Sequence, residues 1–210
     1  MIFIKRYAFA AINLYGVIKL EDFITVFNHY EKEPLFKEEV MPLLELLSSI
    51  SEIDMSFKQG ILANGYYYLN DSKDIRVAKD LLLVQSHKPR YLPPKEEFLK
   101  YEEDDYVEPM KPLLDLEKFI IANKLVVIRR PDDIRSDVLE IHDQIVMGAI
   151  TSEYMAYIKK RGYEFKDEVQ LKLFVGLVMN LHNNTRMYDN CGYTPLEIRE
   201  LTESNSKKVN

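Results

Sequence analysis

The stretch Ile53-Asp-Met-Ser-Phe-Lys-Gln-Gly-Ile-Leu-Ala-Asn-Gly-Tyr-Tyr-Tyr-Leu69 decides the fold class, because its hydrophobic period differs from that of the rest of the chain. Apolar and polar residues alternate over 53–57 and tyrosines fill 66–68, which is typical of β-strands. Lys58-Gln-Gly60 can reverse the chain, so we predict a β-hairpin over 52–69. Asn64-Gly65 is either a bulge in this hairpin or an alternative turn.

The sequence on both sides of the hairpin has the apolar spacing of helices. Upstream, it predicts helices over 2–15, 20–31 and 35–47, with Pro42 as an irregularity in the third. Downstream, it predicts helices near 74–85, 95–100, 112–123, 131–147, 151–161, 167–183 and 194–202. The helix over 167–183 is apolar on nearly all sides, so we expect it to be central and buried. The predicted fold class is therefore mainly α with a small β-hairpin.

Prolines and acidic residues concentrate between the two groups of helices and mark a linker. The segment 88–112 contains five prolines and the run Glu102-Glu-Asp-Asp105. We therefore predict a helix–hairpin module over 1–87, a Pro-rich acidic linker over 88–112, a helical domain over 113–203 and a disordered tail over 204–210.

Three helices followed by a hairpin is the element order of a winged helix-turn-helix, and residues 2–69 resemble that module in order and length. The resemblance implies DNA binding, with the third helix in the major groove. That helix carries Glu38, Glu39 and Glu45 against Lys37 alone, and carboxylates repel the phosphates that supply most non-specific affinity. We therefore favour a module for packing or protein contact and keep nucleic-acid binding as the alternative.

The net charge and the hydropathy of the chain indicate which classes of partner to expect. The 210 residues carry a formal net charge of −6. Residues 1–87 contain 9 Lys/Arg and 12 Asp/Glu, and residues 88–210 contain 19 and 22, so each part carries −3 and neither has the basic footprint of a nucleic-acid-binding domain. No stretch approaches 18 apolar residues and the N-terminal residues lack the order of a secretory signal, so we expect no membrane partner and a cytoplasmic location.

The residues that carry catalysis or bind metals are sparse and scattered. Cys191 is the only cysteine, and the four histidines, His29, His87, His142 and His182, have no spacing that places two on one helix face. The sequence has neither a nucleophile elbow nor a phosphate-binding loop. We therefore predict no enzyme activity, no catalytic residue, no cofactor and no metal site.

The stretch from His182 to Glu197 has the chemistry of a helix–loop–helix corner. Thr194 can cap the following helix, Pro195 suits its first position, and Glu197 can complete a capping box. Arg186, at the end of the preceding helix, can bridge to Asp189 or Glu197. We predict that the residues of this structural corner are Asn190, Gly192, Thr194, Pro195 and Glu197.

The same stretch also supports a functional hypothesis, because polar groups on a rigid loop often carry function. The candidate interaction surface consists of Asn183, Asn184, Arg186 and Tyr188. For the protein as a whole, we expect an unknown protein partner, and a homodimer is the other arrangement left open.

The pattern Asn184-Thr-Arg186, Asn190, Gly192 and Thr194-Pro-Leu-Glu197 is similar to a C-terminal motif of uncharacterised proteins from low-GC Gram-positive bacteria and their phages. Some of those proteins carry a metal-binding tail of the SEC-C type. This chain has no Cys/His cluster after Glu197, so that zinc site is not carried over. The resemblance implies no activity, and we predict a non-catalytic interaction or regulatory protein of such a bacterium or phage.

Overall fold

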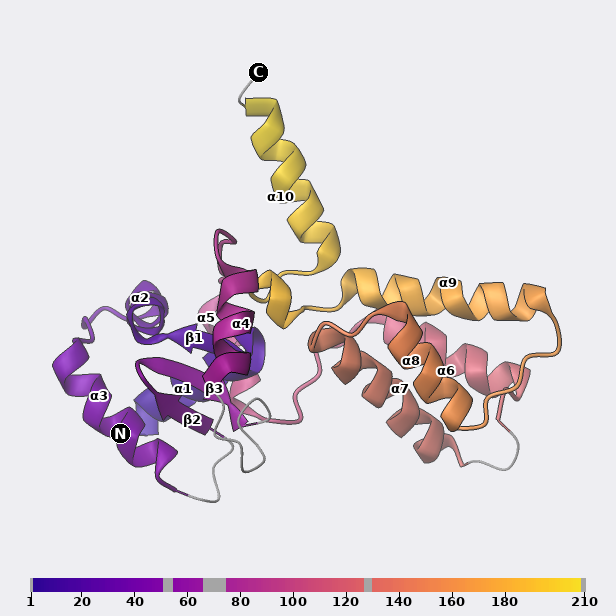
Figure 1. Ribbon diagram of the computed structural model, residues 1–210, viewed down its shortest axis with the longest axis horizontal. Coiled ribbons are helices and arrows are strands. Elements are labelled where there is room, and N and C mark those ends of the chain that lie inside the picture. Colours follow the sequence, from indigo (N-terminus) through magenta and orange to yellow (C-terminus); the bar gives the residue numbers. More distant parts are fainter. Residues whose placement is uncertain (1, 51–54, 66–74, 127–129, 209–210) are drawn as a thin grey trace. The chain divides into compact units, whose positions relative to one another are not determined.

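The computed structural model describes residues 2–50, 55–65, 75–126 and 130–208 (Figure 1). The chain forms two compact units. The first contains Met1–Val107 and Tyr188–Gly192, and the second contains Glu108–Met187 and Tyr193–Asn210. The described residues are mainly helical, with one small antiparallel sheet after the first helices, which confirms the predicted fold class.

The first unit begins as a winged-helix-like module. Its elements are, in chain order, α1 (Ile2–Tyr15), β1 (Val17–Lys19), α2 (Leu20–Tyr30), α3 (Lys37–Ser48), β2 (Met55–Lys58) and β3 (Ile61–Asn64). The strands pair antiparallel in the order β1-β3-β2, with Leu62 opposite both Ile18 and Phe57. The sequence did not predict β1, because three residues are too few to display an alternating pattern.

The hairpin turns at the first of the two places that the sequence offered. Gln59 and Gly60 join β2 to β3 with φ angles of 51° and 73°, the left-handed pair that a tight two-residue turn requires. Asn64 pairs with Met55 and ends β3, so the turn is not at Asn64-Gly65. The predicted strand residues 52–54 and 66–69 lie outside the described residues.

The centre of the first unit is α1, whose residues Tyr7 to Ile12 are all buried. Phe98 fills the core beside it, since its ring lies 5.9 Å from that of Tyr7 and 5.0 Å from that of Tyr30. Phe98 ends the short helix α5 (Lys95–Phe98), which continues as the 3-10 helix η2 (Leu99–Glu102). The helix α4 (Ile75–Gln85) lies between the sheet and α5 in the sequence.

The predicted linker over 88–112 is corrected by this packing. Residues 88–107 belong to the first compact unit, because Phe98 is fully buried there and Arg6 pairs with Glu102 at 2.6 Å. Pro94 precedes α5 and sets its first turn, so the prolines shape a packed segment instead of a spacer.

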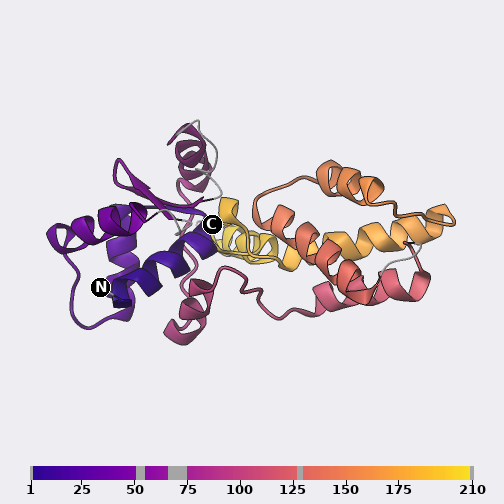
Figure 2. The same cartoon turned by 90° about the horizontal axis from the view of Figure 1, so that it is seen from below.

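The second unit is a helical bundle. It contains α6 (Lys111–Asn123), α7 (Pro131–Val146), α8 (Thr151–Lys160), α9 (Glu168–Asn184) and α10 (Pro195–Lys208). α6, α7 and α9 lie side by side (Figures 1 and 2). No proline or glycine follows Pro195, and α10 accordingly continues to Lys208, through residues that we predicted as a disordered tail.

The prediction that 167–183 is buried on nearly all sides is wrong. α9 is buried along one stripe, formed by Gln170, Phe174, Val178 and Leu181, whereas Val169 and Leu173 are 67% and 57% exposed. The neighbouring helices cover only one side of α9, and apolar residues on its opposite side are exposed to solvent.

A buried carboxylate braces the second unit. Asp137 of α7 is 1% exposed and accepts hydrogen bonds from Arg161 Nε at 2.7 Å, from the Tyr157 hydroxyl at 3.1 Å and from the Tyr163 hydroxyl at 3.0 Å. Burial, reinforced by the Asp137 charge, raises the pKa of Tyr157 to about 12. The network therefore connects α7, α8 and the segment after α8 through one charge.

Candidate functional site

The corner after α9 begins α10 as the sequence predicted. Thr194 Oγ1 accepts the N–H of Glu197 at 3.2 Å, and Glu197 Oε2 accepts the N–H of Thr194 at 2.8 Å, which is a capping box. Arg186 also reaches Glu197, with Nη1 2.9 Å from Oε2, and its Nε donates to Glu108 at 2.8 Å. Each of these contacts lies within the second unit.

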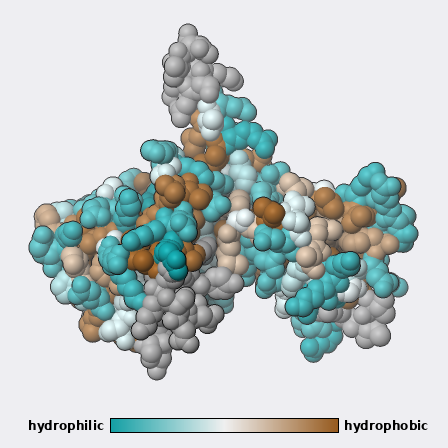
Figure 3. Space-filling view, viewed as in Figure 1, coloured by the Kyte–Doolittle hydropathy of each residue, from teal (hydrophilic) through white to brown (hydrophobic). Residues whose placement is uncertain are grey.

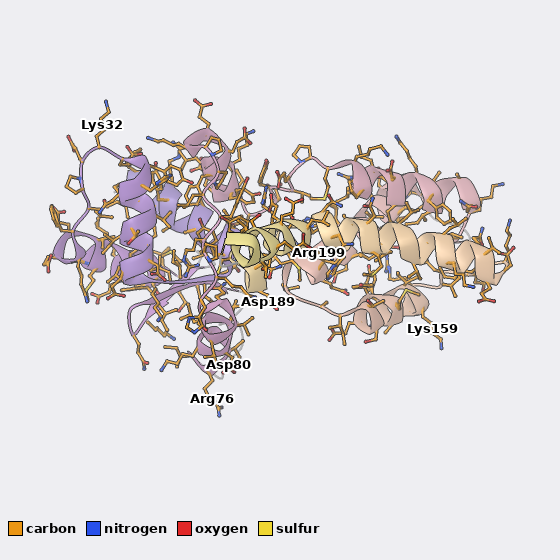
Figure 4. The ribbon with its side chains drawn as sticks, turned by 90° about the horizontal axis from the view of Figure 1, so that it is seen from above. Lys32, Arg76, Asp80, Lys159, Asp189 and Arg199 are labelled. Carbon is orange, nitrogen blue, oxygen red and sulfur yellow. The ribbon has the colours of Figure 1, made fainter. Side chains whose placement is uncertain are left out.

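The middle of the corner belongs to the first unit, where Tyr188–Asn190 form the 3-10 helix η3. Gln85 Nε2 donates to the carbonyls of Tyr15 at 2.7 Å and Tyr188 at 2.8 Å. Lys88 Nζ donates to the carbonyl of Asp189, a residue labelled in Figure 4, at 2.8 Å. Sequence reasoning missed these contacts, because Gln85 and Tyr188 are 103 positions apart.

Gly192 also packs within the first unit. Its φ is +84°, and a Cβ there would lie 3.0 Å from the side chain of Leu14 and 3.1 Å from that of Tyr15. The glycine is therefore required both by its backbone conformation and by a close approach to α1.

The predicted interaction residues are divided between the two units. Tyr188 belongs to the first unit, and Asn183, Asn184 and Arg186 belong to the second. Asn184 Nδ2 donates to the carbonyl of Asn180 at 2.8 Å, and the Arg186 side chain is only 13% exposed. A role in partner binding for these four residues stays a prediction.

Metal-binding side chains do not cluster in the described part of the chain. No three His, Cys, Asp or Glu side chains converge there as a metal ion would require. The Cys191 thiol is buried, and burial raises its pKa. Its Sγ lies 3.7 Å from the carbonyl oxygen of Gln85, an arrangement typical of a packed thiol.

The most open surface of the winged-helix-like module is one side of α3. Val40, Leu44 and Leu47 are buried, and the exposed residues share the opposite side. Two apolar residues next to the helix ends, Phe36 and Ile50, are also exposed. We call this surface the α3 face, and its residues are Phe36, Glu38, Glu39, Pro42, Glu45, Leu46 and Ile50.

The α3 face combines negative charge with large apolar side chains. Phe36 and Leu46 are more than half exposed. Glu39 accepts the N–H of Phe36, whereas Glu38 and Glu45 form no ion pair with another described residue. The only cation on the helix, Lys37, lies 3.5 Å from Glu21 of α2, so the carboxylate that it pairs with belongs to another helix. Figure 3 shows apolar and polar residues interspersed on the visible side of the first unit.

The fold and this surface define a winged-helix-like protein with a helical second unit. Comparison with known proteins found no matching family model, no matching curated protein and no matching solved structure. None of the described helices combines the length and the apolar composition that a bilayer span requires.

Proposed function

We propose that the protein is a non-catalytic interaction protein and that its first unit docks a protein partner through the α3 face. The observation that carries this proposal is the exposure of Phe36 and Leu46 beside the carboxylates of Glu38 and Glu45. Large exposed apolar side chains can serve as contact points for a protein partner. The carboxylates on the same face favour a partner that carries basic residues.

The partner that fits this face is a protein segment with apolar side chains flanked by Lys or Arg. Oppositely charged rims guide two proteins into one orientation, while apolar contacts at the centre supply the affinity. The α3 face carries three carboxylates as well as the exposed apolar side chains, so basic residues on the partner would complement its charge. We propose a regulatory role for this contact, in the cytoplasm of a Gram-positive bacterium or in its phage.

DNA binding is the second candidate, because the module has the full element order of a winged helix, including β1. The charge of α3 opposes it, since Glu38, Glu39 and Glu45 would face phosphates. Titration of duplex DNA at low salt separates the two candidates. We expect no binding at tens of micromolar protein, and salt-dependent binding of the wild type would favour the DNA candidate.

A photo-crosslinking amino acid at position 46 tests the proposed docking in cells that encode the chain. The same amino acid at Val169, an exposed apolar position on α9, is the control. We expect a discrete adduct from position 46 alone, joined to a partner peptide that carries Lys or Arg next to apolar residues. An adduct with a second copy of this chain, or none at position 46, would contradict the proposal.

Charge reversal then tests whether the carboxylates matter. The double variant Glu38→Lys, Glu45→Lys should abolish the adduct. The matched control is Glu200→Lys, Glu203→Lys on α10, which has the same change of charge at exposed positions of the second unit. If the adduct still forms in the charge-reversed α3 variant, the partner does not recognise the carboxylates of this face.

A further inference from the structure

The first unit contains a cleft between α2 and the segment that follows α4. Its volume is about 620 Å³, within the usual range of small-molecule pockets. One wall is a single side of α2, with Asp22, Val26 and His29 at helical spacing. The other wall runs from Gln85 to Arg90, and the buried Cys191 also lines the cleft.

The charge of this lining is opposite in sign to that of the whole chain. The cations are Lys19, Lys88 and Arg90, and the only carboxylate among the lining residues is Asp22, which leaves a surplus of two positive charges. Two histidines, His29 and His87, also line the cleft. In a chain of net charge −6, this concentration of cations would attract a small anion.

Two contacts hold the side chain of Arg90 in place. Its Nη2 donates to Asp22 Oδ2 at 3.1 Å, and its guanidinium lies over the Tyr15 ring at 5.1 Å from the centroid. Its Nη1 is buried and has no hydrogen-bond partner among the described residues. A guanidinium held over an aromatic ring, with Nη1 still able to donate, is suited to recognition of a carboxylate or phosphate.

Gln85, which also lines the cleft, has an unused acceptor. Both protons of its Nε2 are donated to carbonyls, those of Tyr15 and Tyr188, which fixes the orientation of the amide. Its Oε1 is therefore the remaining group, and it is buried without a donor among the described residues. Buried polar atoms without partners are uncommon in native proteins, and a missing ligand is one explanation.

We propose that this cleft binds a small organic anion. The carboxylate or phosphate of the ligand accepts hydrogen bonds from Arg90, and a hydroxyl or amine of the ligand donates to Gln85 Oε1. Its apolar part lies against Val26, Leu82 and Leu92. The Asp22 side chain is about half exposed, so it can move aside when the anion takes its place at Arg90.

Four small probes test the proposal by isothermal titration of the full chain. Benzoate and phenyl phosphate distinguish the two anionic groups. 4-Hydroxybenzoate adds the hydroxyl that Gln85 would accept, and benzamide is the uncharged control. We expect saturable one-site binding of at least one anion, tighter binding of 4-hydroxybenzoate than of benzoate, and none of benzamide. Failure of all three anions to saturate the protein at millimolar concentration would overturn the proposal.

Two substitutions should shift the affinity in opposite directions. Arg90→Gln should weaken anion binding at least tenfold, with Arg90→Lys intermediate. Asp22→Asn should tighten binding several-fold, because it removes the competing carboxylate, and a folding defect cannot produce a gain. Lys159→Gln on α8 (Figure 4) removes an exposed cation of the second unit and should change nothing. Equal affinity of Arg90→Gln and wild type, or weaker binding by Asp22→Asn, would refute the assignment.

Discussion

The guanidinium of Arg186 donates from Nη1 to Oε2 of Glu197 at 2.9 Å. The same carboxylate oxygen accepts the N–H of Thr194, so one negative charge caps α10 and holds Arg186 as well. A carboxylate at this position also interacts favourably with the positive end of the helix dipole. Because the Arg186 side chain is mostly buried and also pairs with Glu108, its contacts within the second unit are those of a brace.

Replacing Arg186 by alanine should therefore destabilise the second unit. The change removes two charge-assisted hydrogen bonds and leaves Glu108 and Glu197 without that cation. We expect a loss of roughly 1.5–3 kcal/mol, the range for hydrogen bonds to charged groups, measured as the free energy of unfolding in urea.

Arg199→Ala is the matched control for this prediction. Arg199 lies exposed on α10 (Figure 4), so its loss should change the free energy of unfolding by less than about 0.5 kcal/mol. If Arg186→Ala is as stable as Arg199→Ala but loses binding to a partner, Arg186 belongs to an interaction surface and the brace is refuted.

The local part of this corner could be predicted from the sequence, and its distant part could not. A capping box depends on residues three positions apart, so it can be predicted from Thr194 and Glu197 alone. The bond from Gln85 to the carbonyl of Tyr188 involves a side chain that has no distinguishing pattern in the sequence. Its partner is a backbone group, which every residue has, so only the fold shows that the two meet.

The difference between local and distant contacts also explains why the sequence predicted the wrong helix to be central. Apolar residues on all sides made 167–183 look buried, but α9 exposes Val169 and Leu173. Burial on all sides needs neighbours on all sides, which depends on how many helices surround the segment. α1 has such neighbours, including α5 and η2, which arise from a stretch that its prolines and acids had marked as a linker.

Gly16→Ala should be more destabilising than Gly60→Ala. Both glycines have a φ of +73°, so both substitutions carry the left-handed penalty of about 1–2 kcal/mol. A Cβ at Gly16 would also lie 2.8 Å from the Tyr188 ring, whereas a Cβ at Gly60 meets nothing within 4 Å. Overpacking typically adds about 1–3 kcal/mol, so the difference between the two variants in urea unfolding measures the Gly16–Tyr188 contact. Equal losses would mean that Tyr188 does not pack on Gly16.

Tyr157 should make stability depend on pH in the alkaline range. Its pKa is raised from 10.0 to about 12, first by burial and then by Asp137, so the folded state favours the protonated phenol. Its contribution is fully present below pH 10 and is lost as the pH rises through about 12. The difference in unfolding free energy between wild type and Tyr157→Phe should therefore be constant below pH 10 and shrink above it. A difference that stays flat across this range would contradict the assignment.

Cys191 offers a direct probe of how firmly the segment Tyr188–Gly192 is held in the first unit. Its thiol is 1% exposed and burial raises its pKa, so a thiol reagent should label it only after local opening. Gln85→Leu removes both hydrogen bonds to the carbonyls of Tyr15 and Tyr188. A loss of about 1.4 kcal/mol from the opening free energy would speed labelling about tenfold. Gln144→Leu, on α7 of the second unit, is the matched control and should leave the rate unchanged. If Gln85→Leu labels no faster than this control, other contacts hold the segment. The Lys88 bond to the carbonyl of Asp189 would then be the next to remove.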